Sequence, residues 1–215
     1  MTADAPRTRS HWWPRPGWHP GRDVYTWHIT FDDAPELHRL AEQYQTQLRP
    51  LSGLNLVPIE WLHLTVQGVG FADEVSDDAL HAVTASVQKS VRTLGAFPAT
   101  FDAPVIFDEA IVLPPTPVEP FQDLLTAIRS GIADALGPDS VQTGPEQARG
   151  FRPHVSLAYS SGEHDSAPYR QALDAADAEP ATVQISAPAL IRQERLLAPE
   201  WLYRWTTEAR APLAA

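Results

Sequence analysis

Two short segments of the chain combine a histidine with a hydroxyl residue two positions later. The tetrapeptides HLTV and HVSL begin at His63 and His154. In an extended strand, residues i and i+2 point to the same side, so His63 would share a face with Thr65, and His154 with Ser156. Histidine titrates near neutrality, and hydroxyl groups donate hydrogen bonds to phosphate oxygens. The two segments therefore predict a site that combines acid–base chemistry with phosphate binding.

The spacing alone carries little weight, because four of the eight histidines begin a His-x-Ser/Thr pattern: His28, His63, His154 and His164. The surroundings separate them. Around His63 and His154 the alternate positions are aliphatic residues or proline, which predicts a core-facing side and a polar side aimed at a cleft. HITF at His28 also alternates, so His28 is either a structural residue or part of the same cleft. His164 lies in GEHDSAP, which predicts a solvated loop.

The elements around these segments alternate between strands and helices. Strands are predicted at residues 23–31, in extended chain over 54–70, in two pieces of 97–113 that are broken near 102–104, and at 151–162, 181–196 and 201–209. Helices are predicted at residues 32–50, 76–95, 121–137 and 167–176. Each His-x-Thr/Ser strand follows a helix-containing unit in its own half of the chain. The order predicts an α+β fold with two similar lobes of mostly antiparallel sheet.

The ends of the chain differ from this pattern. Residues 1–22 are rich in Pro, Arg and Trp without a helical or strand period, which predicts an irregular extension whose tryptophans, Trp12, Trp13 and Trp18, pack back on the body. Residues 23–210 are predicted to form a single two-lobed domain, and residues 211–215 a flexible tail.

The composition narrows the functional classes. The formal net charge is −11 and Lys89 is the single lysine, so no basic run exists that could follow a long phosphate backbone. Any nucleic-acid substrate should be small or bound by its end. Cysteine is absent, which removes disulfides, thiolate zinc sites and cysteine nucleophiles. No secretory signal or membrane span is evident, so we expect a cytoplasmic protein without a membrane partner. The sequence makes no prediction of oligomeric state.

Two histidines and two hydroxyls suit hydrolysis of a cyclic phosphodiester. That reaction needs a base to take a proton from water, an acid to protonate the departing ribose oxygen, and donors for the non-bridging oxygens. A zinc site built from His63, His154 and His28 is the alternative, but no nearby carboxylate has the spacing of a metal ligand. We therefore predict a site without metal or cofactor.

The segments HLTVQGVGFADEV and FRPHVSLAYS resemble the paired H-x-T/S-x motifs of the two-histidine (2H) phosphoesterase superfamily. This superfamily includes the RNA 2',3'-cyclic phosphodiesterases, which have long been called the 2'-5' RNA ligase family. The resemblance covers roughly residues 23–207. It implies a bilobal, pseudo-twofold α+β fold with a central cleft. It also implies that His63 and His154 are acid and base and that Thr65 and Ser156 hold the phosphate.

Other residues of interest have two readings each. Arg152 lies two positions before His154, hence on its face, and either binds phosphate or forms a salt bridge. Tyr159 is a possible cleft-lining residue. It belongs to a set of aromatic residues that either stack a base or fill the core: Tyr25, Trp27, Tyr159, Tyr203 and Trp205.

Three functions remain open from the sequence. The favoured one is a metal-independent phosphoesterase that acts on a 2',3'-cyclic phosphate, or on a related cyclic or 2'-5' phosphodiester, of a nucleotide or RNA end. The second is 2'-5' RNA end joining at the same site, which reverses that chemistry. The third is a non-catalytic module that binds a nucleotide or an RNA end.

Overall fold

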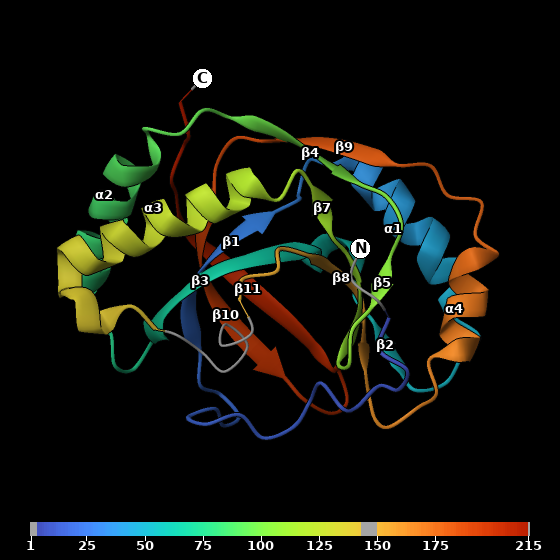
Figure 1. Ribbon diagram of the computed structural model, residues 1–215. Helices are drawn as coiled ribbons and strands as arrows, with labels where there is room; N and C mark the ends of the chain where they lie inside the picture. Colours follow the sequence, from blue (N-terminus) through green and yellow to red (C-terminus); the bar gives the residue numbers. More distant parts are fainter. Residues whose placement is uncertain (1–3, 143–149, 215) are drawn as a thin grey trace.

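The first lobe is built on a four-stranded antiparallel sheet in the order β11-β10-β1-β3. The computed structural model describes residues 4–142 and 150–214. The strands of this sheet are β1 (Val24–Thr30), β3 (His63–Phe71), β10 (Ala189–Leu196) and β11 (Leu202–Arg210). Helices α2 (Asp77–Val91) and α3 (Glu119–Leu136) pack together at its side (Figure 1). β3 forms one edge of the sheet and carries His63 as its first residue.

The second lobe contains two smaller antiparallel sheets. One has the order β2-β8-β6-β5 and consists of β2 (Leu54–Leu56), β8 (Val155–Ser160), β6 (Ala110–Leu113) and β5 (Val105–Ile106). The other joins β7 (Pro115–Thr116), β4 (Phe97–Phe101) and β9 (Ala181–Ile185). Helices α1 (Pro35–Leu48) and α4 (Ala167–Asp174) lie on the opposite side of the molecule from α2 and α3 (Figure 1). Short 3-10 turns cover Ile59–Trp61 and Pro138–Ser140.

The predicted α+β class and the two lobes of antiparallel sheet are confirmed, but the lobes are not the two halves of the sequence. β1 pairs with β3 and also with β10 from the far end of the chain. Helix α1, which follows β1, contacts α4 and β9 in the second lobe instead. The helix before β3 therefore does not pack in the lobe of β3, because strand pairing and helix packing are decided by contacts far apart in sequence.

The helices form as their sequences predict. In α1, residues at helical spacing, Leu37, Leu40, Tyr44 and Leu48, are all buried, which gives the helix one continuous apolar stripe against the core. In α2, the side chain of Ser76 accepts a hydrogen bond from the backbone N–H of Ala79 and caps the first turn. Among the described residues, no helix is long and apolar enough to cross a membrane.

The strand boundaries differ from the prediction at three places. Residues 54–70, predicted as extended chain, contain β2, the 3-10 turn Ile59–Trp61 and most of β3, and the two strands belong to different sheets. Residues 97–113 contain three strands, β4, β5 and β6, with a second interruption at residues 107–109. Residues 181–196 contain β9 and β10, which belong to different sheets. The interruption at residues 107–109 joins β5 and β6 as neighbours in one sheet, whereas the chain passes from one sheet to another between β9 and β10. Apolar composition alone reveals neither a turn of this kind nor a change of partner.

The predicted flexible tail is wrong for the residues that the structure describes. Ala211 and Leu213 are buried. The N–H of Ala214 donates to the carbonyl of Leu94 at 2.8 Å, and the N–H of Ala96 donates to the carbonyl of Ala214 at 2.9 Å. The apolar side chains and these backbone bonds hold the segment against the body. Ala215 lies outside the described residues.

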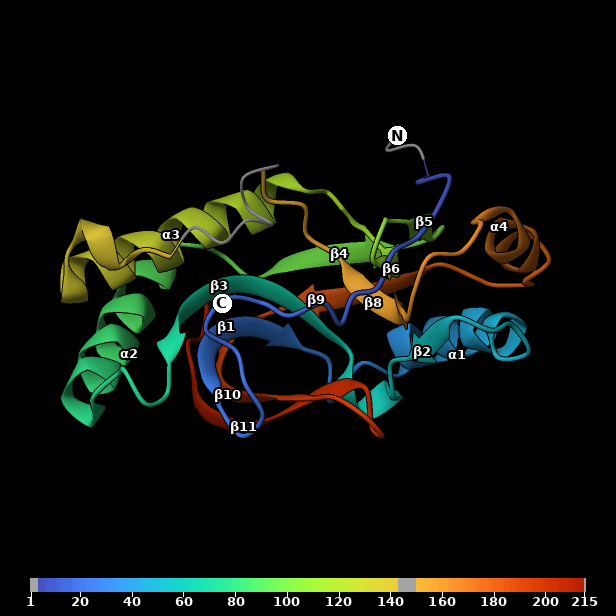
Figure 2. The same ribbon diagram turned by 90° about the horizontal axis from the view of Figure 1, so that it is seen from below.

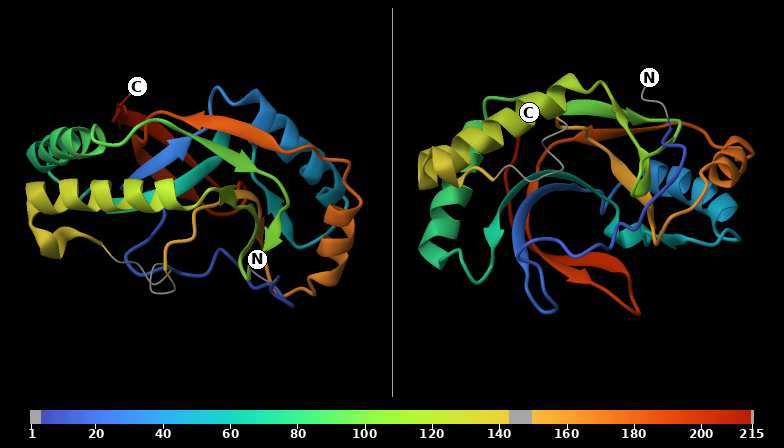
Figure 3. Two further views of the ribbon diagram at one scale, coloured as in Figure 1. Left: turned by 45° about the horizontal axis from the view of Figure 1, so that its top comes forward. Right: turned by 60° about the horizontal axis from the view of Figure 1, so that its bottom comes forward.

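Residues 4–22, hereafter the strap, run without helix or strand apart from one bridge between Arg7 and Asp165. The strap begins beside the second lobe and crosses to the first, ahead of β1 (Figures 2 and 3). Asp4 pairs with Arg170 of α4 at 2.7 Å. At the other end, Arg22 pairs with Asp73 at 2.8 Å. The strap therefore spans both lobes and is held at each end by an ion pair.

The three tryptophans of the strap pack on the body, as the sequence predicts. Trp12 is buried and donates its indole N–H to the side-chain oxygen of Asn55 at 2.9 Å. Trp13 donates its indole N–H to Glu109 at 3.0 Å. The ring of Trp18 meets the ring of Phe71 edge-on, with centroids 5.6 Å apart.

Candidate active site

The two motif histidines are held in the same way. The Nδ1–H of His63 faces the carbonyl oxygen of Trp61 at 2.8 Å, and that of His154 faces the carbonyl oxygen of Arg152 at 2.7 Å. A carbonyl oxygen can only accept a hydrogen bond, so Nδ1 carries a proton in both rings. Each Nε2 is therefore the nitrogen that accepts or releases a proton in a reaction.

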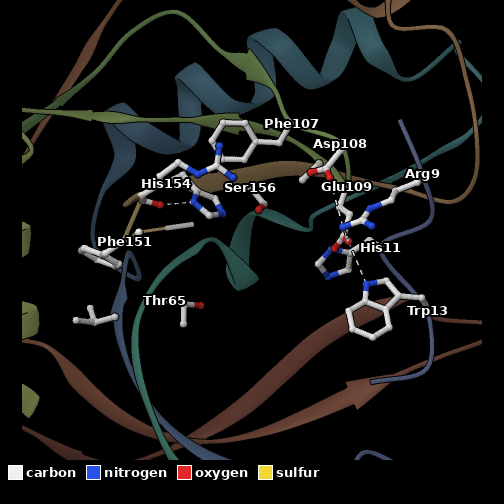
Figure 4. Close-up of a pocket in the computed structure, with 14 residues that line it drawn as sticks. Arg9, His11, Trp13, Thr65, Phe107, Asp108, Glu109, Phe151, His154 and Ser156 are labelled. Carbon is white, nitrogen blue, oxygen red and sulfur yellow. Dashed lines mark hydrogen bonds and ion pairs between the residues drawn. The ribbon is translucent and has the colours of Figure 1, made fainter. Parts of the chain in front are cut away.

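A pocket of about 420 Å³ lies between the two lobes. Four residues predicted from the sequence line it: Thr65 of β3, and Arg152, His154 and Ser156 at and before β8. Figure 4 shows His154, Ser156 and Thr65 around one part of this space. The structure thus brings together hydroxyls from two strands that belong to different sheets, beside one histidine and one arginine.

His63 lies behind this wall rather than in it, with 9% of its surface exposed. Its ring stacks on that of His28, with centroids 4.6 Å apart and planes inclined by 5°. His28 is opposite Thr65 in the pairing of β1 with β3, and its Nε2 lies 3.1 Å from the Thr65 hydroxyl oxygen. His28 is fully buried and does not line this pocket, which favours the structural one of its two predicted roles. It supports His63 and Thr65 from the core side.

Burial dominates the electrostatics of the histidines. Burial, with a smaller contribution from the charge of His154, lowers the pKa of His63 to about 4 against the opposing hydrogen bond to Trp61. Burial also lowers the pKa of His154, as does the charge of Arg152. The pKa of His28 is lowered well below its usual value by burial and then by His63. His63 and His154 are therefore within electrostatic range of each other, and a bound anion would favour their protonated forms.

The described surroundings of Arg152 favour one of its two predicted roles. Its guanidinium carbon lies 4.1 Å from the centre of the Phe107 ring, and within the described part of the chain the side chain forms no ion pair. The side chain is exposed at the pocket. A guanidinium placed on an aromatic face, without a carboxylate, is available to pair with a phosphate.

Tyr159, predicted as a possible cleft-lining residue, is buried behind the pocket. Its ring stacks on that of His11 with centroids 4.1 Å apart, and burial raises its pKa. The other aromatic candidates follow the core interpretation, because Tyr25, Trp27 and Tyr203 are also buried. Trp205 is half-buried, and its ring meets that of His63 at 5.1 Å.

Several pocket residues escaped prediction. Arg9, His11 and Trp13 come from the strap, and Phe107, Glu109 and Phe151 come from loops. No periodicity marks these positions, and their neighbours in space are distant in sequence. The Trp-rich composition was the one available signal, since it predicted that the strap packs on the body. Among the described residues, no three His, Asp or Glu side chains are grouped to hold a metal ion.

Two His-x-Thr/Ser strands whose hydroxyls line one pocket, with His154 in the pocket and His63 behind its wall, in a two-lobed α+β fold, are typical of the 2H phosphoesterase class. The model of the 2'-5' RNA ligase superfamily matches residues 31–196, and the chain belongs to this superfamily. No protein of curated function matches the chain in sequence.

Solved structures share the fold at low sequence identity. TT0787 of Thermus thermophilus is 20% identical with a TM-score of 0.66, covering 88% of this chain and 97% of that chain. E. coli LigT in complex with 3'-AMP is 18% identical with a TM-score of 0.63, covering 90% and 99%. A protein described as a phosphoesterase is 17% identical with a TM-score of 0.60, covering 92% and 100%.

Proposed function

We propose that this protein is a metal-independent phosphoesterase that hydrolyses a 2',3'-cyclic phosphate, or a related cyclic or 2'-5' phosphodiester, of a nucleotide or RNA end. The observation that carries the proposal is the convergence of Thr65, Ser156, His154 and Arg152 on one pocket, with His63 in electrostatic range. Histidine, hydroxyl and guanidinium groups are what such a reaction needs without a metal.

In the proposed reaction the oxygen of a water molecule attacks phosphorus and its proton passes to Nε2 of His63. The bond from phosphorus to one ribose oxygen breaks, and that oxygen takes a proton from Nε2 of His154. The product is a nucleoside phosphomonoester. The low pKa of His63, about 4, favours it as the base, because it is neutral when substrate arrives. The phosphate charge raises the pKa of His154 in the complex and so supplies the acid.

The remaining groups hold the phosphate. The hydroxyls of Thr65 and Ser156 donate to the non-bridging oxygens, and the guanidinium of Arg152 balances their charge. Thr65 can donate in this way when His28 Nε2, 3.1 Å away, is the protonated nitrogen of its ring and donates to the hydroxyl. E. coli LigT, which has a similar fold, has been crystallised with phosphate and with 3'-AMP, ligands of the kind that this pocket would release.

End joining is the second candidate, favoured by the name of the superfamily. It uses the same site, with the hydroxyl of a second RNA end attacking the cyclic phosphate in the place of water, so that one ring P–O bond breaks and the two ends are joined. The binding-module interpretation would leave the same pocket occupied without turnover. Product analysis separates the three, since ligated RNA, a 2'- or 3'-monoester, or unchanged ligand would accumulate.

The direct test is a panel of nucleoside 2',3'-cyclic phosphates, with and without EDTA. We expect turnover that EDTA does not reduce. His63→Ala and His154→Ala should each lower kcat by roughly 10²- to 10⁴-fold, the usual contribution of a general acid or base. His81→Ala, an exposed histidine of α2, is the matched control and should leave kcat unchanged. Full turnover by both active-site variants would disprove the mechanism.

A further inference from the structure

The strap supplies one wall of the pocket. Figure 4 shows Arg9, His11 and Trp13 on the side opposite His154 and Phe151. The superfamily model matches only from residue 31 onward, so this wall comes from a segment that the family match does not include. A wall opposite the reacting groups contacts whatever part of the substrate extends beyond the phosphate.

The carboxylate of Glu109 contacts three strap residues at this wall. Glu109 forms ion pairs with Arg9 at 2.6 Å and with Arg15 at 3.4 Å. It also accepts a hydrogen bond from the indole N–H of Trp13 at 3.0 Å. Glu109 lies in the loop between β5 and β6. Arg9 also pairs with Asp108 at 3.3 Å, so the strap residues at the pocket are tied to this loop of the second lobe chiefly through Glu109.

His11 ties the same part of the strap to both lobes. Its ring stacks on Tyr159 of β8, with centroids 4.1 Å apart. Its Nε2 lies 3.0 Å from the hydroxyl oxygen of Tyr203 of β11. Because β8 and β11 belong to different lobes, the strap closes one end of the space between them.

The chemistry of the wall favours a base over a second phosphate. The guanidinium groups of Arg9 and Arg15 are both engaged with carboxylates, so they offer little positive charge to a further anion. Trp13 offers an indole, which Arg15 approaches to 5.3 Å from the ring centre. Aromatic rings stack nucleobases of any identity. The volume of about 420 Å³ falls in the range of roughly 300–1,000 Å³ that encloses one small ligand.

We infer that the strap makes the site selective for a single nucleotide unit, with the indole of Trp13 as the surface on which the base packs. The inference rests on the proposed phosphoester chemistry at the opposite wall. It assigns the substrate class: nucleoside cyclic phosphates, rather than the cyclic phosphate at the end of a longer RNA.

Three substrates test the assignment through kcat/KM. They are adenosine 2',3'-cyclic phosphate, a pentaribonucleotide that ends in the same group, and glycerol 1,2-cyclic phosphate, which has no base. We expect wild-type protein to prefer the mononucleotide to the pentamer by at least about tenfold. Trp13→Ala should lower kcat/KM for the mononucleotide about tenfold, as expected for one lost base stack, and leave that for the glycerol ester unchanged. Trp18→Ala, from the same strap but outside this pocket, is the matched control.

A second variant tests whether the strap closes one end of the pocket. Glu109→Gln removes the anchoring charge and should reduce the preference for the mononucleotide over the pentamer. Equal wild-type rates on both, or an equal effect of Trp13→Ala on the glycerol ester, would overturn the inference. If wild-type protein hydrolyses none of the substrates, the proposed function fails by itself. Calorimetry with adenosine 3'-monophosphate then decides the inference, which requires Trp13→Ala to weaken the Kd about tenfold relative to Trp18→Ala.

Discussion

Acidification should destabilise the protein through His63. Its pKa is about 4 in the folded state, against an ordinary value of 6.5. Between these values the unfolded chain binds a proton that the folded protein does not, so the free energy of unfolding falls as the pH falls. The shift corresponds to a loss of about 2 kcal/mol between pH 7 and pH 5, and of about 3 kcal/mol by pH 4. Above about pH 6.5 this contribution is fully present.

The assay is urea denaturation at a series of pH values for wild type and for His63→Gln. The variant lacks the titrating group, so its stability should fall less on acidification, by about 2 kcal/mol at pH 5 relative to pH 7. His28 and His11, whose pKa values are lowered mainly by burial, contribute with the same sign to both proteins. Only the smaller part of each shift that the charge of His63 causes is lost in the variant. Parallel curves for the two proteins would show that His63 is not a buried neutral imidazole and would refute the reasoning.

Three further predictions concern activity and packing. In the free protein the pKa values of both His63 and His154 lie below the ordinary value for histidine. The bell-shaped pH profile of kcat/KM should therefore have its maximum below pH 7, with its acidic limb set by the base and its alkaline limb by the acid. A maximum at alkaline pH would contradict these assignments. Arg152→Gln should raise KM for a cyclic nucleotide about tenfold or more, since a charge-assisted contact to phosphate is lost, and an unchanged KM in steady-state kinetics would exclude phosphate binding by this residue. Gly131→Ala should lower the free energy of unfolding by about 1–2 kcal/mol in urea denaturation, because the added Cβ would lie 2.7 Å from the Cα of Val87. Gly95→Ala is the control, since nothing lies within 4 Å of a Cβ at that position. Equal stabilities of the two variants would show that α2 and α3 can move apart to make room for the Cβ without a loss of stability.

The order of elements was largely predictable because each depends on neighbours in sequence. Leu37, Leu40, Tyr44 and Leu48 repeat with the period of a helix and are buried on one side of α1. The alternation around His63 and His154 predicted that each hydroxyl shares the face of its histidine. Thr65, Ser156 and His154 line one pocket, whereas His63 lies behind its wall. A side chain on a strand has its face fixed by the chain itself.

The sequence by itself therefore determined the α+β class, the bounds of the helices to within a few residues, the approximate positions of most strands, and the superfamily motifs with their paired histidines. Only the tertiary structure decided that the lobes interleave, that His28 supports His63 from the core, and that the strap reaches the pocket. These features depend on contacts such as that of Glu109 with Arg9 and Trp13, which join residues about 100 positions apart. Local periodicity carries no information about such partners, because they meet only when the sheets and the strap have packed.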